Sequence, residues 1–169
     1  MELFCKSVIG EAPDLVRQGV QVKIMGERTH FSQRVLDMIE RIEAVTGSAR
    51  RLTLMLAFNY SSRREMVLAA QALAERVARG EMAAEDISEE CFSGALMTAG
   101  TPDPDLIIRT SGEYRLSNFL LWQASYSEFY FPEVLWPDFD EGEFDKAMAE
   151  FARRERRYGL VTEQIEDEE

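Results

Sequence analysis

The stretch Leu52-Thr-Leu-Met-Leu-Ala-Phe58 is apolar at six of its seven positions. An apolar run of this length is typical of a strand that other elements cover on both faces, as in a parallel sheet. Other short segments also have strand character, and one of them, Val20–Met25, ends in a turn at Gly26. We therefore predict strands at Val20–Met25, Leu52–Phe58, Leu106–Ile108 and Glu128–Phe131.

Segments with apolar residues at helical spacing lie between these strands. Residues 2–18 are predicted to form one helix or two short ones, because Pro13 can kink or break a helix. Capping residues mark two more helices: Ser88 precedes one that reaches about Met97, and Ser117 or Asn118 precedes one at 119–127. The other helices are expected at 31–45, 62–78 and 140–158.

Strands that alternate with helices predict an α/β fold in which helices flank a parallel sheet. With 169 residues and 46% hydrophobic content, the chain is long enough for one domain with a real core. We expect that domain to span residues 1–162. The last seven residues, 163–169, include five acids and are predicted to form a disordered acidic tail.

The chain is strongly acidic, with 31 Asp and Glu against 19 Lys and Arg and a net charge of −12. Nucleic acid is therefore not expected as a partner, and any bound anion must be held locally. Cys5 and Cys91 lie far apart and form no metal-binding motif, which favours a reducing, cytoplasmic location. No apolar run approaches the roughly 20 residues of a transmembrane helix.

A cationic loop follows the predicted strand at Leu106–Ile108, where ligands bind in open α/β sheets. Arg109 and Arg115 each offer a planar fork of donors, Gly112 allows a turn, and Ser117 is expected to start a helix. This combination predicts a phosphate or diphosphate site. The alternative is that both arginines pair with the surplus acids and that Ser117 is only a helix cap.

The run from Asp105 to Trp136, "DLIIRTSGEYRLSNFLLWQASYSEFYFPEVLW", and the following "PDFDEGEFDKAMAEFARRERRYG" resemble the C-terminal signature of the cis-prenyltransferases. Within that family the resemblance is to the undecaprenyl diphosphate synthases, also called isoprenyl transferases. It extends upstream through "LTLMLAFNYSSRREMV" and "VKIMGERTHFS" to Met1. The fold expected from it is α/β and incomplete relative to the family.

The resemblance implies cis-prenyl chain elongation, in which isopentenyl diphosphate is condensed onto an allylic diphosphate, usually farnesyl diphosphate, to make a polyprenyl diphosphate. It implies that Arg109, Arg115 and Ser117 bind isopentenyl diphosphate, in agreement with the site expected from the loop itself. It also implies a Mg²⁺ ion associated with Glu128, and a carboxylate is a suitable ligand for that cation. Without the motif, Glu128 would be interpreted as an exposed charge.

Further residues receive expected roles from the same resemblance. Glu113 matches an acid of the site or the interface. Arg157 and Gly159 match an Arg-x-Gly element that reaches the partner's phosphates across a homodimer interface, although ordinary helix capping also explains them. Leu52 and Leu54 match residues of a hydrophobic tunnel, and from the sequence alone they are core residues. A lipid product could bring the protein to a membrane surface.

The family's aspartate-containing "MDGNGRWA"-like segment has no counterpart in this sequence. Three hypotheses follow: an enzyme whose N-terminal part is missing from this chain, a non-catalytic subunit of a heteromeric cis-prenyltransferase, or an unrelated phosphate-binding α/β module. Retention of Arg109, Arg115, Ser117 and Glu128 favours the first. We expect strands next to the missing part to have unpaired edges and an uncovered apolar face.

We predict that the 169-residue chain alone does not elongate prenyl chains, because its sequence contains no candidate for the catalytic aspartate. The test is incubation of the purified chain with farnesyl diphosphate, labelled isopentenyl diphosphate and Mg²⁺. Label in products longer than farnesyl diphosphate would refute this prediction.

Overall fold

The computed structural model describes residues 2–154 of the chain. The described residues divide into two compact units, one up to Gly100 and one from Thr101 onward, which we describe separately. The expected domain over residues 1–162 stays a prediction, and the expected acidic tail at 163–169 lies outside the described residues. Helices flank parallel strand pairs in the chain, which confirms the predicted α/β class.

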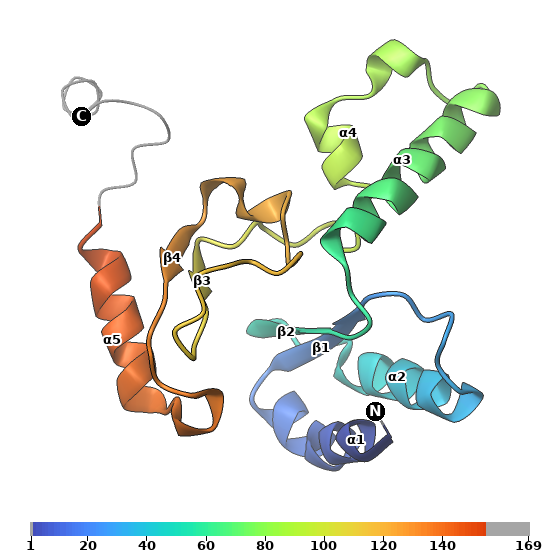
Figure 1. Ribbon diagram of the computed structural model, residues 1–169. Helices are drawn as coiled ribbons and strands as arrows, with labels where there is room; N and C mark the ends of the chain where they lie inside the picture. Colours follow the sequence, from blue (N-terminus) through green and yellow to red (C-terminus); the bar gives the residue numbers. More distant parts are fainter. Residues whose placement is uncertain (1, 155–169) are drawn as a thin grey trace. The chain divides into compact units, whose positions relative to one another are not determined.

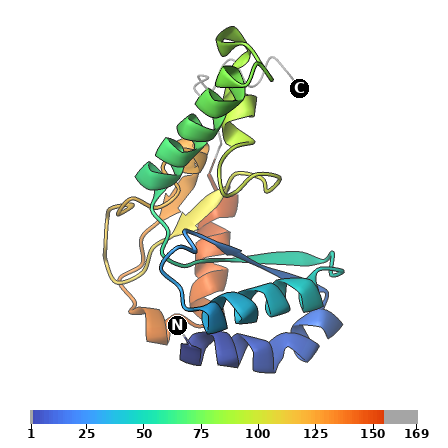
Figure 2. The ribbon, with the colours of Figure 1, turned by 90° about the vertical axis from the view of Figure 1, so that its right-hand side faces the viewer.

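The first unit is built on a β-α-β arrangement preceded by a helix (Figure 1). Strands β1 (Val20–Met25) and β2 (Leu52–Ala57) pair in parallel, with Val20 opposite Leu52 and Met25 opposite Ala57. Helices α1 (Glu2–Arg17) and α2 (Gln33–Thr46) lie side by side on one face of this pair (Figure 1, Figure 2). Their core joins Ala12, Val22 and Ile42.

The rest of the first unit is helical. Helix α3 (Ser62–Ala78) follows β2, and the Ser61 hydroxyl accepts a hydrogen bond from the Arg64 amide at its start. A short 3₁₀ turn, η1 (Ala84–Asp86), leads to α4 (Glu89–Ser93), whose predicted N-cap Ser88 is confirmed. Helix α4 ends before the predicted Met97, because the Met97 amide instead donates to the buried Glu65 carboxylate of α3.

The predicted burial of β2 on both faces is wrong. Leu52 is 58% exposed and Leu54 is 38% exposed, although both share a face with the partly buried Leu56. The reason is the position of the strand: among the described residues β2 has one strand neighbour, β1, and the cover from α1 and α2 is centred on β1. These two leucines are therefore exposed apolar residues and not the core residues that the sequence pattern predicted.

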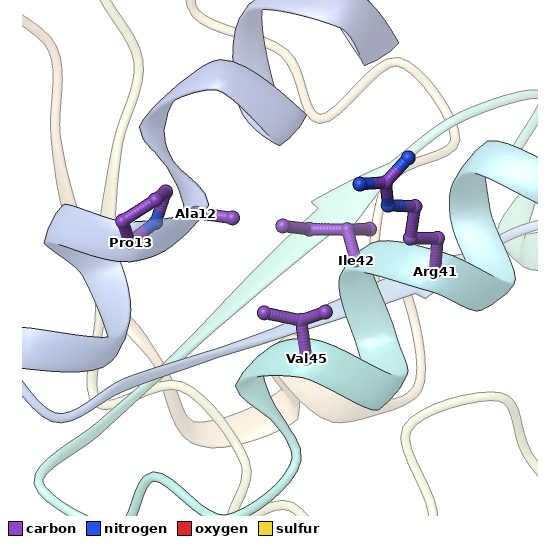
Figure 3. A pocket seen from close by; sticks show the side chains of 5 residues that line it. All are labelled: Ala12, Pro13, Arg41, Ile42 and Val45. Atoms are coloured by element: carbon purple, nitrogen blue, oxygen red, sulfur yellow. The ribbon is translucent and has the colours of Figure 1, made fainter.

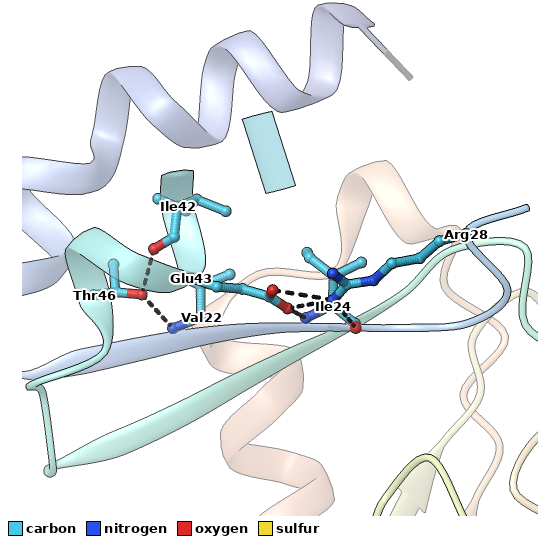
Figure 4. A network of polar contacts seen from close by, with 6 residues as sticks. All are labelled: Val22, Ile24, Arg28, Ile42, Glu43 and Thr46. Carbon is cyan, nitrogen blue, oxygen red and sulfur yellow. Dashed lines mark hydrogen bonds and ion pairs between the residues drawn. The ribbon is translucent and has the colours of Figure 1, made fainter. Parts of the chain in front are cut away.

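The outer edge of β1 is closed by side chains of α2 (Figure 4). The backbone N–H of Val22 donates to the Thr46 hydroxyl at 3.0 Å, and the Ile24 N–H donates to the Glu43 carboxylate at 2.9 Å. Thr46 in turn donates to the Ile42 carbonyl at 2.8 Å, and Arg28 donates to both Glu43 oxygens. Helix α2 therefore supplies the hydrogen bonds that another strand would otherwise make.

The second unit contains a shorter parallel pair, β3 (Leu106–Ile108) and β4 (Glu128–Tyr130), in which Leu106 lies opposite Glu128. The 3₁₀ turns η2 (Gln123–Tyr126) and η3 (Trp136–Asp138) flank β4. Helix α5 (Glu141–Ala152) lies beside β4 and starts at Asp140, whose carboxylate accepts from the Glu143 amide (Figure 1).

The helix predicted at residues 119–127 is wrong. Ser117, Asn118 and Leu120 have φ angles of 50°, 63° and 47°, in the left-handed region, so a right-handed helix cannot begin there. Only the short turn η2 forms in this segment. Ser127 then donates to the Pro104 carbonyl at 2.5 Å, which holds the chain at the start of β4 beside the segment that enters β3.

We expect Thr46→Val to expose the Val22 amide to hydrogen exchange, because valine keeps the shape of threonine but removes the acceptor. An unsatisfied buried N–H costs about 1–3 kcal/mol, and Val22 and Thr46 are both buried. Exchange of the Val22 amide, measured by NMR, should accelerate more than that of Ile24, which keeps Glu43 as its acceptor. Thr46→Ser retains the hydroxyl and is the control; equal Val22 exchange in both variants would contradict the assignment.

Candidate functional site

The loop that follows β3 is tied to the segment that follows β4. The Arg109 amide donates to the Tyr130 carbonyl at 2.9 Å, the Ser111 amide to the Val134 carbonyl at 2.8 Å, and the Gly112 amide to the Pro132 carbonyl at 3.1 Å. Ser111 and Gly112 have φ angles of 70° and 62°, which turn the chain. The start of this loop is therefore held by its backbone, and its side chains remain available for other contacts.

Arg115 forms an ion pair with Glu113 two residues before it. The Arg115 side chain is 66% exposed, so the pair is solvated and weak by comparison with a buried one. Between them, the Tyr114 ring packs against Phe131 with centroids 5.3 Å apart. Glu113, which was expected to belong to the site or the interface, is thus the ion-pair partner of the predicted site residue Arg115.

Arg109 has a different environment. It is half-buried, and its guanidinium has no carboxylate partner among the described side chains of residues 10–154. The sequence left open that both arginines form ion pairs with acidic residues. Among the described residues, this is the case for Arg115 but not for Arg109. Arg109 presents an uncommitted fork of donors just beyond the carboxyl end of β3, which is a chemically suitable contact for a phosphate group.

The helix N-terminus expected to support this anion site is absent. Ser117 and Asn118 are left-handed and no α-helix begins at them, so the expected contribution of a helix dipole has no basis in this structure. Ser117 is exposed, and its hydroxyl remains a possible hydrogen-bond donor to an anion. The anion site therefore depends on side chains, chiefly the arginines.

Glu128, at the start of β4, is paired with Arg154 at the end of α5. One guanidinium nitrogen of Arg154 lies 2.8 Å from the Glu128 Oε2 and donates also to the Phe129 carbonyl at 2.8 Å. The hydrogen bond with Glu128 is the main cause that raises the pKa of Arg154. Sequence reasoning missed Arg154; the run of arginines at 153, 154, 156 and 157 was the available signal.

Glu128 is a possible ligand for one metal ion but does not form a metal site alone. Among the described side chains of residues 10–154 there is no cluster of three or more His, Cys, Asp or Glu residues suited to a metal. In the same range, the Glu128 Oε1 accepts no hydrogen bond. A single carboxylate oxygen fits Mg²⁺, which is commonly held by one or two carboxylates together with substrate phosphates.

Glu128 is the first residue of β4, whereas Arg109 follows the last residue of its partner strand β3. Glu128 lies opposite Leu106, three positions before Arg109. At a rise of about 3.3 Å per residue, this offset is about 10 Å along the strands. A ligand that contacts both side chains must therefore span the gap, as a diphosphate with a bound cation can when both long side chains reach toward it.

The remaining predicted residues lie elsewhere. Leu52 and Leu54 are exposed on β2 of the first unit, and Arg157 and Gly159 fall outside the described residues. A small pocket of about 130 Å³ lies between α1 and α2, lined by Ala12, Pro13, Arg41, Ile42 and Val45 (Figure 3). None of the predicted site residues lines it. Among the described residues, no helix is long and apolar enough to cross a membrane.

Comparison with known proteins gives a consistent result. A family profile described as "Putative undecaprenyl diphosphate synthase" matches residues 1–159. The chain is 48% identical over 152 residues to an isoprenyl transferase of Agrobacterium fabrum, covering 90% of this chain and 62% of that protein. It is 44% identical over 168 residues to a farnesyl-diphosphate-specific ditrans,polycis-undecaprenyl-diphosphate synthase of Pseudomonas aeruginosa, covering 99% of this chain and 67% of that protein. The chain thus spans about two thirds of the length of these relatives.

Solved structures agree with these sequence matches. The crystal structure of lavandulyl diphosphate synthase from Lavandula x intermedia, in complex with dimethylallyl diphosphate, has a TM-score of 0.89 and 34% identity; the match covers 94% of this chain and 69% of that one. A probable undecaprenyl diphosphate synthase from Campylobacter jejuni has a TM-score of 0.79 and 32% identity, with 94% and 72% coverage. The fold and the sequence thus point to the same group of proteins.

We expect Glu113→Gln to strengthen binding of inorganic diphosphate, because Arg115 then loses its carboxylate partner. An exposed ion pair is worth up to about 1 kcal/mol, so the expected gain is about two- to fivefold in affinity. Isothermal titration calorimetry at low ionic strength measures it. Asp103→Asn is the matched control, because it removes the same charge from an exposed residue of the same unit without an ion pair to Arg115. Equal effects of the two substitutions would mean that Arg115 takes no part in binding.

Proposed function

Because this chain belongs to the undecaprenyl diphosphate synthase family of prenyltransferases, we propose that it acts in cis-prenyl chain elongation. In this reaction isopentenyl diphosphate is joined to an allylic diphosphate, and farnesyl diphosphate is the substrate named for the Pseudomonas aeruginosa relative. The product is a polyprenyl diphosphate. The family match over residues 1–159 favours this function over an unrelated phosphate-binding module.

The reaction requires two diphosphate sites with different tasks. The allylic diphosphate must leave, whereas the diphosphate of the isopentenyl unit is retained in the product. We assign the retained group to the loop that starts at Arg109, because the uncommitted Arg109 guanidinium beyond β3 can bind it without first breaking an ion pair. This feature is the observation that carries the proposal.

Arg115 and Ser117 complete the proposed site. Arg115 would exchange its solvated contact with Glu113 for the diphosphate, an exchange that costs little because the pair is exposed. The exposed Ser117 hydroxyl would donate to a phosphate oxygen. Firm backbone anchoring at Arg109, Ser111 and Gly112 keeps the first part of the loop in position while the later side chains rearrange.

Glu128 is the residue that would hold Mg²⁺, through its Oε1, together with diphosphate oxygens. When bound, this cation offsets the negative charge of the diphosphates. Leu52 and Leu54 offer exposed apolar surface on β2 that a growing hydrocarbon chain could contact. Arg157 and Gly159 remain proposed contacts to the phosphates of a partner subunit in a homodimer, and a lipid product would favour association with a membrane surface.

We expect Arg109→Ala to weaken isopentenyl diphosphate binding more than farnesyl diphosphate binding. A hydrogen bond to a charged group is worth about 1.5–3 kcal/mol, which corresponds to a loss of about tenfold or more in affinity. Calorimetric titration of the 169-residue chain with each diphosphate measures the two effects separately. Arg153→Ala is the control, since Arg153 pairs with Glu150 on the exposed face of α5. Equal losses for both ligands would contradict the assigned role.

A further inference from the structure

Arg154 occupies a position between three acceptors. Its guanidinium contacts the Glu128 carboxylate, the Phe129 carbonyl and, at 3.5 Å, the Glu150 carboxylate. Arg154 and Glu128 are 31% and 29% exposed, so their pair is less solvated than the other ion pairs of this unit. The residue lies just after the end of α5, where the helix dipole favours a cation.

The contact with Phe129 makes Arg154 part of the sheet. In β4, the Glu128 amide and the Tyr130 carbonyl bond toward β3, so the Phe129 carbonyl points to the opposite edge. The Arg154 guanidinium satisfies that carbonyl from outside. Arg154 can therefore stay at the edge of β4 through Phe129 and Glu150 when Glu128 changes partner, because a guanidinium has five N–H donors.

We propose that Arg154 is a positioning residue that competes with a divalent cation for the Glu128 carboxylate. This inference rests on the magnesium role proposed for Glu128. Without a cation, the carboxylate is held by Arg154; with a cation and a diphosphate, it turns its charge to the metal while Arg154 remains anchored at the strand edge. The pair therefore makes metal binding dependent on the simultaneous presence of a polyanion, which supplies the negative charge that balances both cations.

The charges around Glu128 determine whether loss of the Arg154 guanidinium strengthens or weakens cation binding. A divalent cation held by Glu128 would be close to the Arg154 guanidinium, because that guanidinium contacts the same carboxylate, and the two positive charges would repel each other appreciably in a half-buried site. Removal of the guanidinium charge also leaves Glu128 without its internal counter-ion. Both effects increase the affinity of Glu128 for a cation. If Arg154 served only to hold α5 against β4, its removal would loosen that contact, and the expected result would be weaker metal binding.

The neighbouring Arg153 provides a matched control. It has the same charge and lies on the same helix end, but its side chain is 76% exposed and pairs with Glu150. No contact with Glu128 is present for Arg153 among the described residues. Arg153→Gln and Arg154→Gln therefore change the net charge equally. Only Arg154→Gln removes the ion-pair partner of the Glu128 carboxylate.

The experiment measures Mn²⁺ binding to the 169-residue chain by electron paramagnetic resonance, with inorganic diphosphate present and Mn²⁺ in place of Mg²⁺. We expect Arg154→Gln to tighten Mn²⁺ binding about three- to tenfold, by the Coulomb argument after screening by salt. Arg153→Gln should leave it within about twofold of the original chain, because its charge is solvated. Arg154→Lys keeps the positive charge and should remain close to the original chain, even where the α5 contact is loosened.

The outcomes separate this inference from the proposed function. If Glu128→Gln leaves Mn²⁺ binding unchanged, the metal role of Glu128 fails and the competition fails with it. If Glu128→Gln weakens Mn²⁺ binding while Arg154→Gln weakens it too, or matches Arg153→Gln, the metal role stands and the competition is refuted. Tighter binding in both Arg154→Gln and Arg154→Lys would also refute it, because the charge would then be irrelevant.

Discussion

A parallel sheet of two strands has two open edges, and the backbone groups on those edges need hydrogen-bond partners. In each unit, side chains from a helix or its end supply partners for one of these edges, that of β1 in the first unit and that of β4 in the second. Thr46 and Glu43 of α2 accept from the amides of Val22 and Ile24 on β1, and Arg154 at the end of α5 donates to the Phe129 carbonyl on β4. Each helix is thereby fixed against its strand by polar contacts as well as by apolar packing.

This constraint also explains how the candidate site is arranged. The guanidinium that closes the edge of β4 is the one that holds Glu128, so a structural contact and a proposed metal ligand share one side chain. The opposite side of β4 pairs with β3, and its ladder continues as the bonds that anchor the loop at Arg109. The two parts of the proposed site are thus linked through a single short strand, although their side chains are not in contact.

The basic residues of the chain differ in whether they form ion pairs. The chain has many more acids than bases, and most cations of the described residues are paired with an acid nearby. Against this background Arg109 is informative, since its half-buried guanidinium has no carboxylate partner in the described part of the chain and so has donors available for a ligand. Arg115 is different, because a solvated pair with Glu113 can be exchanged for an anion at low cost.

Local sequence patterns determined the location of the four strands that the described residues contain, because alternation and short apolar runs depend on residues that are neighbours in the chain. They also determined the family and the loop that carries Arg109 and Arg115. They failed where distant residues decide the outcome. The left-handed backbone at Ser117 and Asn118 replaced a predicted helix, and the position of β2 at the edge of its sheet left Leu52 exposed.

The contact between Arg154 and Glu128 joins residues 26 positions apart, and it exists because α5 packs against β4. No periodicity of either segment encodes such a pairing, and an arginine in a basic run has many possible partners. The sequence by itself therefore determined which elements form and which charged groups are present. Only the tertiary structure decided which of those groups neutralise each other and which remain available to a ligand, because ion pairs depend on distance in space.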